Sequence, residues 1–156
     1  MKIYTVCFSG HRELPKNRLA NIADKLKMKI EALIKSGYYC FESGGALGFD
    51  ILAAQIVLKL KKKYPHINLI LILPCKQQTK YWDKSDIIIY DNVKKRADKI
   101  IYTSDVYYNG CMHKRNRALV DTANVCLCYL EKNSGGTFYT VKYAESKGLR
   151  IINIAE

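Results

Sequence analysis

The sequence predicts an α/β fold, a three-layer sandwich in which helices cover both faces of a mainly parallel β-sheet. Short apolar, β-prone runs alternate with longer amphipathic segments, which is typical of β-α-β units with right-handed crossovers. The run at residues 67–73 is apolar apart from Asn68, as expected of a strand buried on both faces of a parallel sheet. No linker, repeat or low-complexity segment divides the 156 residues, so we expect one domain over residues 1–156.

Each predicted element follows from a local pattern. Apolar residues recur at helical spacing between Leu19 and Ile34, and Ser36-Gly37 is a typical helix end. Tyr64-Pro65 ends the helix that begins at Ala46. The expected strands are residues 3–8, 38–42, 67–73, 99–103, 125–130 and 150–154. The expected helices are residues 19–34, 46–62, 85–97, 111–122 and 137–147.

Composition restricts the class of protein. A hydrophobic content of 49% suits a globular domain with a sizeable core. No apolar run is long enough to span a bilayer, so we expect no membrane partner, and the N-terminus lacks the order of residues that marks a signal peptide. The six cysteines show no CxxC pair and no metal-type spacing with the three histidines. We therefore expect buried, reduced thiols, no metal site and a cytoplasmic protein.

The net charge of +12 indicates an anionic partner. Lys59 and residues 61–63 stand at a predicted helix end, where cations complement the helix dipole, so we interpret this cluster as a solvated surface. The remaining excess of positive charge favours a nucleotide or a nucleic acid.

The residues that follow each strand form the candidate site, because ligands of parallel sheets bind beyond the carboxyl ends of the strands. A Ser-Gly-Gly triplet occurs twice, each time between a predicted strand and a helix. Glycine either allows a tight turn or lets a phosphate approach the N–H groups of a helix start. Two triplets at one sheet edge, together with Ser-Gly-His-Arg and Met-His-Lys-Arg stretches, favour a phosphate site. The candidate ligand-binding residues are Ser9, Gly10, His11, Arg12, Ser43, Gly44, Gly45, Asp50, Pro74, Asn109, Arg115, Ser134, Gly135, Gly136 and Thr137.

Some of these candidates have an ordinary structural role as the alternative. Ser134 and Thr137 either cap the following helix or contact a phosphate, since both use the same local geometry. Asp50 either complements the positive end of its helix, or contacts a ribose hydroxyl, or orients Arg12 or Arg115.

Other side chains at the predicted sheet edge have more varied interpretations. We expect His11 to be a hydrogen-bonding loop residue, because no nucleophile accompanies it. Arg115 is expected to bind two phosphate oxygens through its planar guanidinium. Tyr108 and Trp82 either stack on a base or pack in the core or a lid.

Four ordered stretches, SGHR, SGGALGFD, MHKRNRALVDTA and SGGTFYTVKYAESKG, resemble the motifs of the SLOG superfamily, in particular its small stand-alone YpsA-like branch. The superfamily includes the DNA-processing protein A family and the Lonely Guy phosphoribohydrolases. The resemblance covers nearly the whole chain. It implies a Rossmann-like domain that binds a nucleotide or an ADP-ribose-like molecule, requires no cofactor and forms homo-oligomers. The implied role is that of a ligand sensor in signalling, defence or sequestration.

The resemblance to the Lonely Guy enzymes leaves an enzymatic alternative, a nucleoside 5′-monophosphate phosphoribohydrolase. Arg115 matches the functional arginine of that family, whereas Lys142 stands where its motif PGGxGTxxE has the catalytic glutamate. Glu145 lies on the same helix face and either replaces that carboxylate or is a solvent-facing charge. We therefore rank binding above hydrolysis and, as a further alternative, consider binding of single-stranded nucleic acid.

Overall fold

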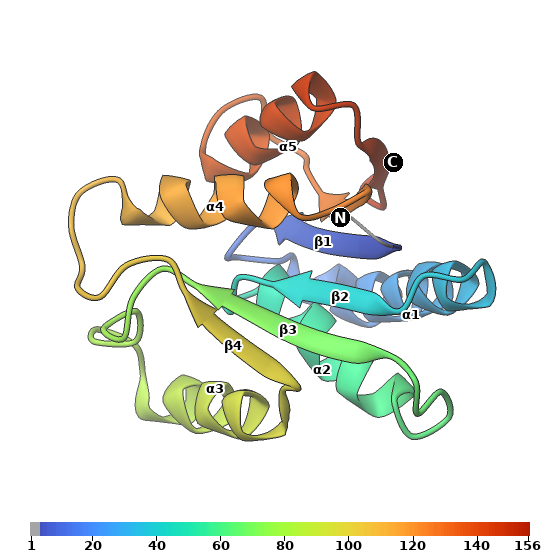
Figure 1. Ribbon diagram of the computed structural model, residues 1–156, viewed down its shortest axis with the longest axis horizontal. Coiled ribbons are helices and arrows are strands. Elements are labelled where there is room, and N and C mark those ends of the chain that lie inside the picture. Colours follow the sequence, from blue (N-terminus) through green and yellow to red (C-terminus); the bar gives the residue numbers. More distant parts are fainter. Residues whose placement is uncertain (1–3) are drawn as a thin grey trace.

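All six strands of the computed structural model run parallel in one sheet, in the order β4-β3-β2-β1-β5-β6 (Figure 1). The structure describes residues 4–156, so Ile3 of the first predicted strand lies outside the described residues. The strands are β1 (Thr5–Gly10), β2 (Cys40–Ser43), β3 (Asn68–Leu73), β4 (Lys99–Tyr102), β5 (Val125–Tyr129) and β6 (Arg150–Asn153). The helices are α1 (Leu19–Lys35), α2 (Phe49–Leu60), α3 (Lys84–Arg96), α4 (Cys111–Asp121) and α5 (Gly136–Ser146), with a short 3₁₀ helix η1 (Lys16–Arg18) before α1.

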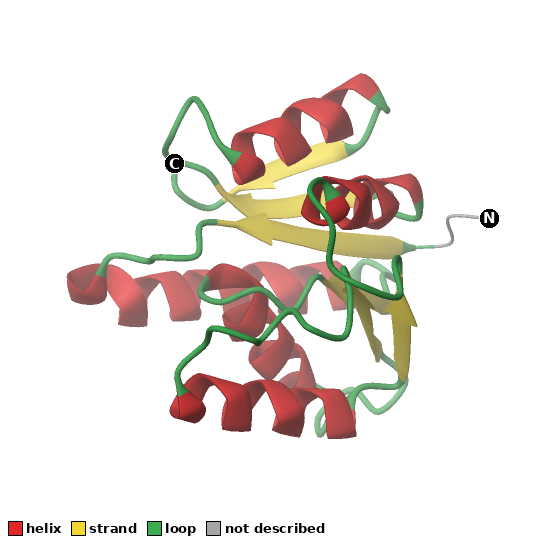
Figure 2. Ribbon diagram, turned by 90° about the vertical axis from the view of Figure 1, so that its left-hand side faces the viewer, coloured by secondary structure: helices red, strands yellow, loops and turns green. Residues whose placement is uncertain are grey.

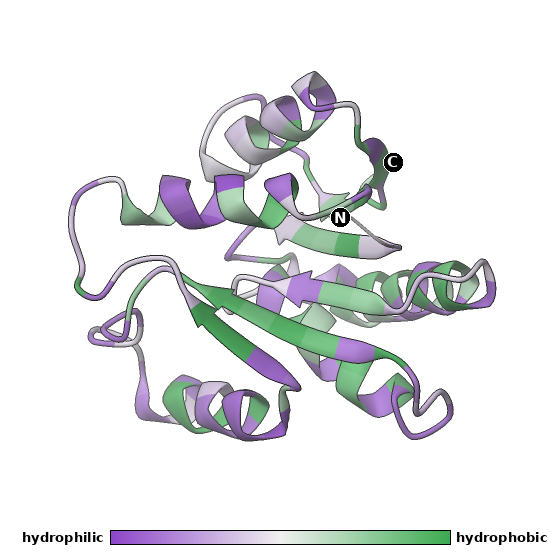
Figure 3. Cartoon of the chain, in the orientation of Figure 1, coloured by the Kyte–Doolittle hydropathy of each residue, from purple (hydrophilic) through white to green (hydrophobic). Residues whose placement is uncertain are grey.

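Helices cover both faces of the sheet, which confirms the predicted Rossmann-like three-layer sandwich (Figure 2). Val6 and Phe8 of β1 pack in the larger part of the core with α1, α2 and α3, whereas Cys7 packs on the opposite face with α4 and α5. Strand β3 is almost entirely hydrophobic, as a central parallel strand requires (Figure 3). Within residues 4–156, no helix combines the length and hydropathy needed to cross a membrane.

The chain order creates a topological switch point between β1 and β5. From β1 the chain adds strands in one direction as far as β4, and it then returns to the other side of β1 for β5 and β6. The loops that follow β1 and β5 therefore lead to helices on opposite faces, which leaves a crevice at the carboxyl ends of these two strands. This crevice is where the candidate site lies.

The main difference from the predicted elements is the start of α2. The pattern predicts a helix from Ala46, but regular helix begins at Phe49. Gly48 has a φ of +79°, in the left-handed region, so the helix cannot include the preceding residues. Residues 46–48 instead form a turn that brings the helix start against the loop after β1.

Five of the six cysteines are buried, as predicted, whereas Cys40 is only partly buried. All six are free. Cys7, Cys126 and Cys128 are fully buried between the sheet and the layer of α4 and α5. This is the environment in which cysteine packs as a hydrophobe.

Candidate functional site

A cavity of about 540 Å³ opens at the carboxyl edge of the sheet, at the switch point between β1 and β5. The end of β1 and the first turns of α2, α4 and α5 form its wall. Within residues 4–156, no side chain caps these three helices by a hydrogen bond. Helix starts carry partial positive charge, which suits an anion. The predicted residues that line the cavity are Ser9, Gly10, His11, Arg12, Asp50, Arg115, Ser134, Gly135, Gly136 and Thr137.

Two glycines let the loop after β1 pack directly against the start of α2. A Cβ atom at Gly10 would lie 2.2 Å from Cγ of Phe49, and one at Gly48 would lie 2.2 Å from the carbonyl oxygen of Arg12. The N–H of Phe49 donates a hydrogen bond of 3.2 Å to the carbonyl oxygen of His11. This close contact fixes the loop that carries Arg12 at the rim of the cavity.

Arg115 is the buried cation of the site. Arg115 is 3% exposed and is one of the residues that line the cavity. Nη1 donates hydrogen bonds to the carbonyl oxygen of Gly44 and to Oε1 of Gln78, and Nε donates to Oδ1 of Asn116. Nη2 has only the sulfur of Met112 as a partner, at 3.8 Å, and sulfur is a weak acceptor. The guanidinium is therefore held by two of its nitrogens while the third has no oxygen partner among residues 4–156.

Asp50 is a buried carboxylate beside this cation. It is 6% exposed, it lines the cavity, and no salt bridge joins it to Arg115 or to any other cation of residues 4–156. Burial raises the pKa of Asp50 to about 6, against the opposing effects of Arg115, the Ala46 N–H and Arg12. Burial also lowers the pKa of Arg115. A bound anion would supply the negative charge that Arg115 lacks within hydrogen-bonding distance.

His11 accepts a hydrogen bond in the structure, as its predicted loop role requires. Nε2 of His11 accepts from the N–H of Glu131 at 3.0 Å, so this nitrogen carries no proton. Burial and the nearby Lys132 lower the pKa of His11, whereas Glu131 raises it less strongly. The neutral imidazole thereby joins the loop after β1 to the loop after β5.

The second Ser-Gly-Gly triplet faces open space. Gly135 has a φ of +96° and precedes the first residue of α5. A Cβ atom at Gly135 or Gly136 would meet no atom within 4 Å. Neither Ser134 nor Thr137 forms a capping hydrogen bond at this helix start. Gly136 and Thr137, the first two residues of α5, line the cavity.

The first Ser-Gly-Gly triplet lies outside the cavity lining and packs against the core. Oγ of Ser43 donates a hydrogen bond of 2.9 Å to the carbonyl oxygen of Asp50. A Cβ atom at Gly44 would lie 2.7 Å from Nη1 of Arg115. Gly45 has a φ of +69°, and its Cβ atom would lie 2.8 Å from the side chain of Leu73. This triplet therefore positions Arg115 instead of facing the cavity.

Two further candidates also lie away from the cavity lining, and several lining residues were not predicted. Pro74 is buried directly after β3, and Asn109 is exposed in the loop before α4.

Glu13 and Lys132 line the cavity but were not predicted. Each stands one to three residues beyond a predicted motif or strand, so considering more residues after each strand would have included them. The unpredicted lining residues are Phe8, Glu13, Ala46, Met112, His113, Asn116 and Lys132.

The carboxylates at the cavity differ from the one considered for catalysis. Glu145 lies near the C-terminal end of α5, is exposed, and forms an ion pair of 3.7 Å with Lys142. The cavity is lined instead by the carboxylates of Glu13 and Asp50. Among residues 4–156, no group of three or more His, Cys, Asp and Glu side chains is placed to hold a metal ion.

Comparison with known proteins agrees with the fold and the motifs. The chain is 32% identical over 140 residues to the SPbeta prophage-derived protein YoqJ of Bacillus subtilis, a match that covers 81% of this chain and 82% of YoqJ. Among solved structures, DNA processing protein A from Helicobacter pylori has a TM-score of 0.67 at 20% identity over 96% of this chain. The same protein from Streptococcus pneumoniae has a TM-score of 0.69 at 16% identity, also over 96% of this chain.

The match to these structures concerns the fold of one part of larger proteins. This chain spans 64% of the H. pylori protein and 50% of the S. pneumoniae protein. The family model YpsA, described as the YspA SLOG family, matches residues 10–152, which include all four motifs quoted from the sequence apart from Ser9. The chain therefore belongs to the YspA SLOG family, as its motifs predict.

Proposed function

We propose that this protein binds a nucleotide or a nucleotide-derived, ADP-ribose-like molecule in the cavity between β1 and β5. A phosphate group of the ligand lies between Nη2 of Arg115 and the first turn of α5, and no cofactor is needed. The observation that carries this proposal is the state of Arg115, which is buried and held by Gly44 and Gln78, while Nη2 has only a sulfur partner within residues 4–156.

The surroundings of Arg115 support an anionic ligand of this size. A volume of about 540 Å³ lies within the range of ordinary small-molecule sites. Arg12 and Lys132 add two further cations to the cavity wall. Arg12 is exposed and forms no hydrogen bond or ion pair with the rest of residues 4–156, so its guanidinium is available to a ligand.

Calorimetric titration with AMP, ADP-ribose and ribose 5-phosphate tests the proposal. Arg115→Ala should weaken binding by about 10- to 150-fold, because a hydrogen bond to a charged group contributes about 1.5–3 kcal/mol. Arg117→Ala is the matched control, since Arg117 is exposed on the same helix and does not line the cavity. Unchanged affinity in a folded Arg115→Ala variant would contradict the proposal.

Binding of single-stranded nucleic acid is the second candidate. The H. pylori neighbour binds single-stranded DNA. A groove of about 630 Å³ between α4 and α5 continues from the cavity and is lined by Arg117, Tyr139 and Lys142, a combination of cations and an aromatic ring that suits a nucleic-acid strand. Affinity for an oligonucleotide that falls steeply with salt, and falls further in Arg117→Ala, would favour this candidate; affinity indifferent to salt would exclude it.

The cellular role that we propose is one that needs only ligand binding and no turnover of the ligand. A cytoplasmic sensor or sequestering protein for a nucleotide-derived signal fits the proposed site, and the prophage origin of YoqJ fits a role in phage-linked signalling or defence. Mass spectrometry of protein purified without added ligand would identify a co-purifying nucleotide and so name the signal.

A further inference from the structure

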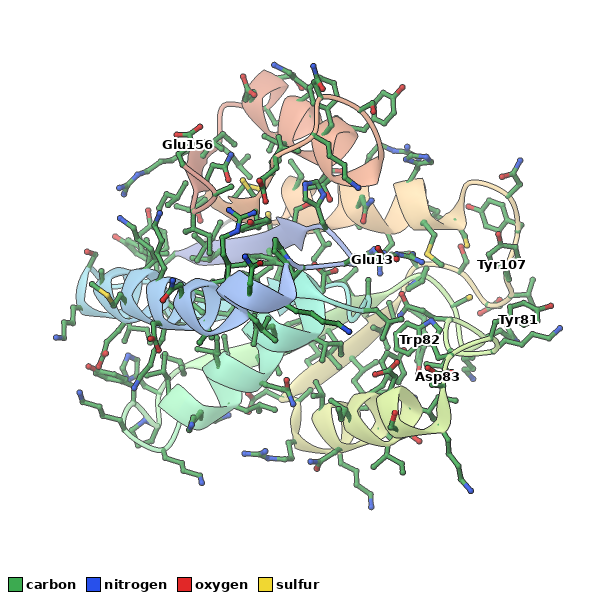
Figure 4. All side chains as sticks on the ribbon, turned by 180° about the vertical axis from the view of Figure 1, so that it is seen from behind. Glu13, Tyr81, Trp82, Asp83, Tyr107 and Glu156 are labelled. Atoms are coloured by element: carbon green, nitrogen blue, oxygen red, sulfur yellow. The ribbon has the colours of Figure 1, made fainter. Side chains whose placement is uncertain are left out.

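A second groove, of about 640 Å³, adjoins the cavity and lies between the loop after β3 and the loop after β4. We refer to it as the aromatic groove. Tyr81, Trp82 and Tyr107 come from these two loops and lie at the same side of the molecule (Figure 4). Arg12 and Met112 line both the cavity and the aromatic groove, so the two compartments are continuous.

The aromatic rings of this groove are unusually open to solvent. Tyr81 is 89% exposed and Tyr107 is 61% exposed, and Val106 beside them is 61% exposed. Trp82 is partly buried and lines the groove, and its ring lies edge-on to that of Tyr90 with 5.2 Å between the ring centroids. Clustered exposed aromatic side chains have a cost in water and indicate a binding surface. Tyr108, the other predicted stacking residue, is 44% exposed and does not line this groove.

A chain of hydrogen bonds connects the two compartments. Gln78 lines the aromatic groove, and its Oε1 accepts a hydrogen bond of 3.3 Å from Nη1 of Arg115. Nε2 of Gln78 lies 3.3 Å from the hydroxyl of Tyr90, the residue against which Trp82 packs. The N–H of Tyr107 donates to Oε1 of Gln77, which ties the loop after β4 to the loop after β3. Hydrogen bonds therefore connect the residues of the aromatic groove to Arg115 of the cavity.

We propose that the aromatic groove binds the nucleobase of the ligand whose phosphate occupies the adjoining cavity, with Tyr81, Trp82 and Tyr107 as its stacking partners. This assignment rests on the proposed function, because it uses the phosphate position to place the base. Arg12, at the junction of the two compartments, contacts the ribose-phosphate part that links them. Planar bases of every kind stack on aromatic rings, so the groove selects a base-containing ligand over a bare sugar phosphate.

The single tryptophan of the chain is Trp82, so tryptophan fluorescence reports on the surroundings of a side chain that lines this groove. AMP should quench this fluorescence on binding, whereas ribose 5-phosphate should bind in calorimetry and leave the fluorescence unchanged. The double variant Tyr81→Ala/Tyr107→Ala should bind AMP about 5- to 100-fold more weakly and bind ribose 5-phosphate as the parent does. Tyr4→Ala is the matched control, because Tyr4 is 55% exposed and lines neither the cavity nor either groove.

The outcomes separate this assignment from the proposed function. Two outcomes would overturn the base assignment and leave the phosphate site in place. In the first, AMP, GMP, CMP and UMP bind the parent protein no more tightly than ribose 5-phosphate. In the second, the double variant still binds AMP more tightly than ribose 5-phosphate, by the same factor as the parent. A larger loss of AMP binding in Tyr4→Ala than in the double variant would also overturn it. If neither ribose 5-phosphate nor any of the four nucleotides binds the parent protein, the proposed function itself fails.

Discussion

The carbonyl oxygen of Gly44 accepts a hydrogen bond from Nη1 of Arg115, across 71 residues of sequence, and the missing side chain of Gly44 makes room for that guanidinium. The side chain of Arg115, which lines the cavity, thus packs on the glycine-rich loop after β2. In the proposed site this loop would act indirectly, through the position of Arg115, whereas the loop before α5 would contribute its own N–H groups.

Gly44→Ala should weaken AMP binding without unfolding the protein. The new methyl group would lie 2.7 Å from Nη1 and 2.9 Å from Cζ of Arg115, so the flexible end of the arginine must move away. We expect about a tenfold loss of affinity by calorimetry and a nearly unchanged melting temperature. In an Arg115→Ala background the same substitution should have no further effect, because the two changes act through one group. Equal losses in both backgrounds would show that Gly44 acts independently of Arg115.

The two Ser-Gly-Gly loops should respond differently to valine. Gly136→Val should leave the protein folded and abolish binding. Beyond the adjacent backbone of α5, no atom of residues 4–156 lies within 4 Å of the new Cβ, and the side chain would occupy the proposed phosphate space. Gly45→Val should destabilise the fold, since Gly45 has a φ of +69° and its Cβ would lie 2.8 Å from the Leu73 side chain. Circular dichroism melting beside calorimetry distinguishes the two effects. A folded Gly136→Val variant that binds AMP as tightly as the parent would show that the start of α5 does not contact the ligand.

Glu145→Gln should change neither nucleotide binding nor nucleotide integrity. Glu145 is exposed and paired with Lys142, and the cavity wall does not include it. Chromatography of AMP incubated with the protein should recover intact AMP. Release of adenine at catalytic turnover would restore the hydrolase alternative, and Glu13→Gln and Asp50→Asn would then show which cavity carboxylate is responsible.

Glu42→Gln should stabilise the protein at pH 8 and have little effect at pH 5. Burial raises the pKa of Glu42 to about 7, against the opposing hydrogen bond from Thr122, so the folded state favours the protonated form. A carboxyl whose folded pKa exceeds its unfolded pKa loses stability as pH rises between the two values, here from about 4.5 to about 7. Glutamine remains neutral and removes a cost of about 2–3 kcal/mol at pH 8.

Denaturant unfolding at several pH values measures this effect. The parent protein should gain stability relative to Glu42→Gln as the pH falls from 8 to 5. Asp50, whose pKa is also raised, contributes in the same direction to both proteins, so the difference between them isolates Glu42. A difference in unfolding free energy that is constant with pH would mean that Glu42 does not titrate in this range.

We expect the protein to form a homodimer that buries the edge of the sheet at β4. Strand β4 is an edge strand of the sheet, and α3 lies beside it (Figure 1). Ile88 and Ile89 of α3 are 63% and 38% exposed, and Ile100 and Ile101 of β4 are 36% and 38% exposed. Exposed apolar side chains next to an unpaired strand edge favour association. Light scattering should give a dimeric mass for the parent and a monomeric mass for Ile88→Asp; a monomeric parent over a wide concentration range would contradict this expectation.

Much of the architecture could be predicted because parallel strands and their helices have distinct local patterns. The apolar run at 67–73 became the central strand β3, and the residues directly after β1 and β5 came together in the cavity. The role of Gly44 and Gly45 could not be predicted, because a glycine pair before a helix has the same sequence pattern whether it faces a ligand or a buried side chain. That distinction depends on where α4 places Arg115, which is a property of the tertiary structure.

The distribution of aromatic residues was predicted only in part. Trp82 was a candidate for stacking, but Tyr81 and Tyr107 were not, since tyrosines occur throughout this sequence. Their proximity arises because the loops after β3 and β4 leave the same edge of neighbouring strands. No local pattern contains that information.

A crystal structure of the protein grown with AMP tests the central claim most directly. We predict phosphate density within hydrogen-bonding distance of Nη2 of Arg115 and of the N–H groups of Gly136 and Thr137, in the cavity between β1 and β5. Clear density for AMP at another surface, or an empty cavity in crystals at saturating AMP, would contradict the account.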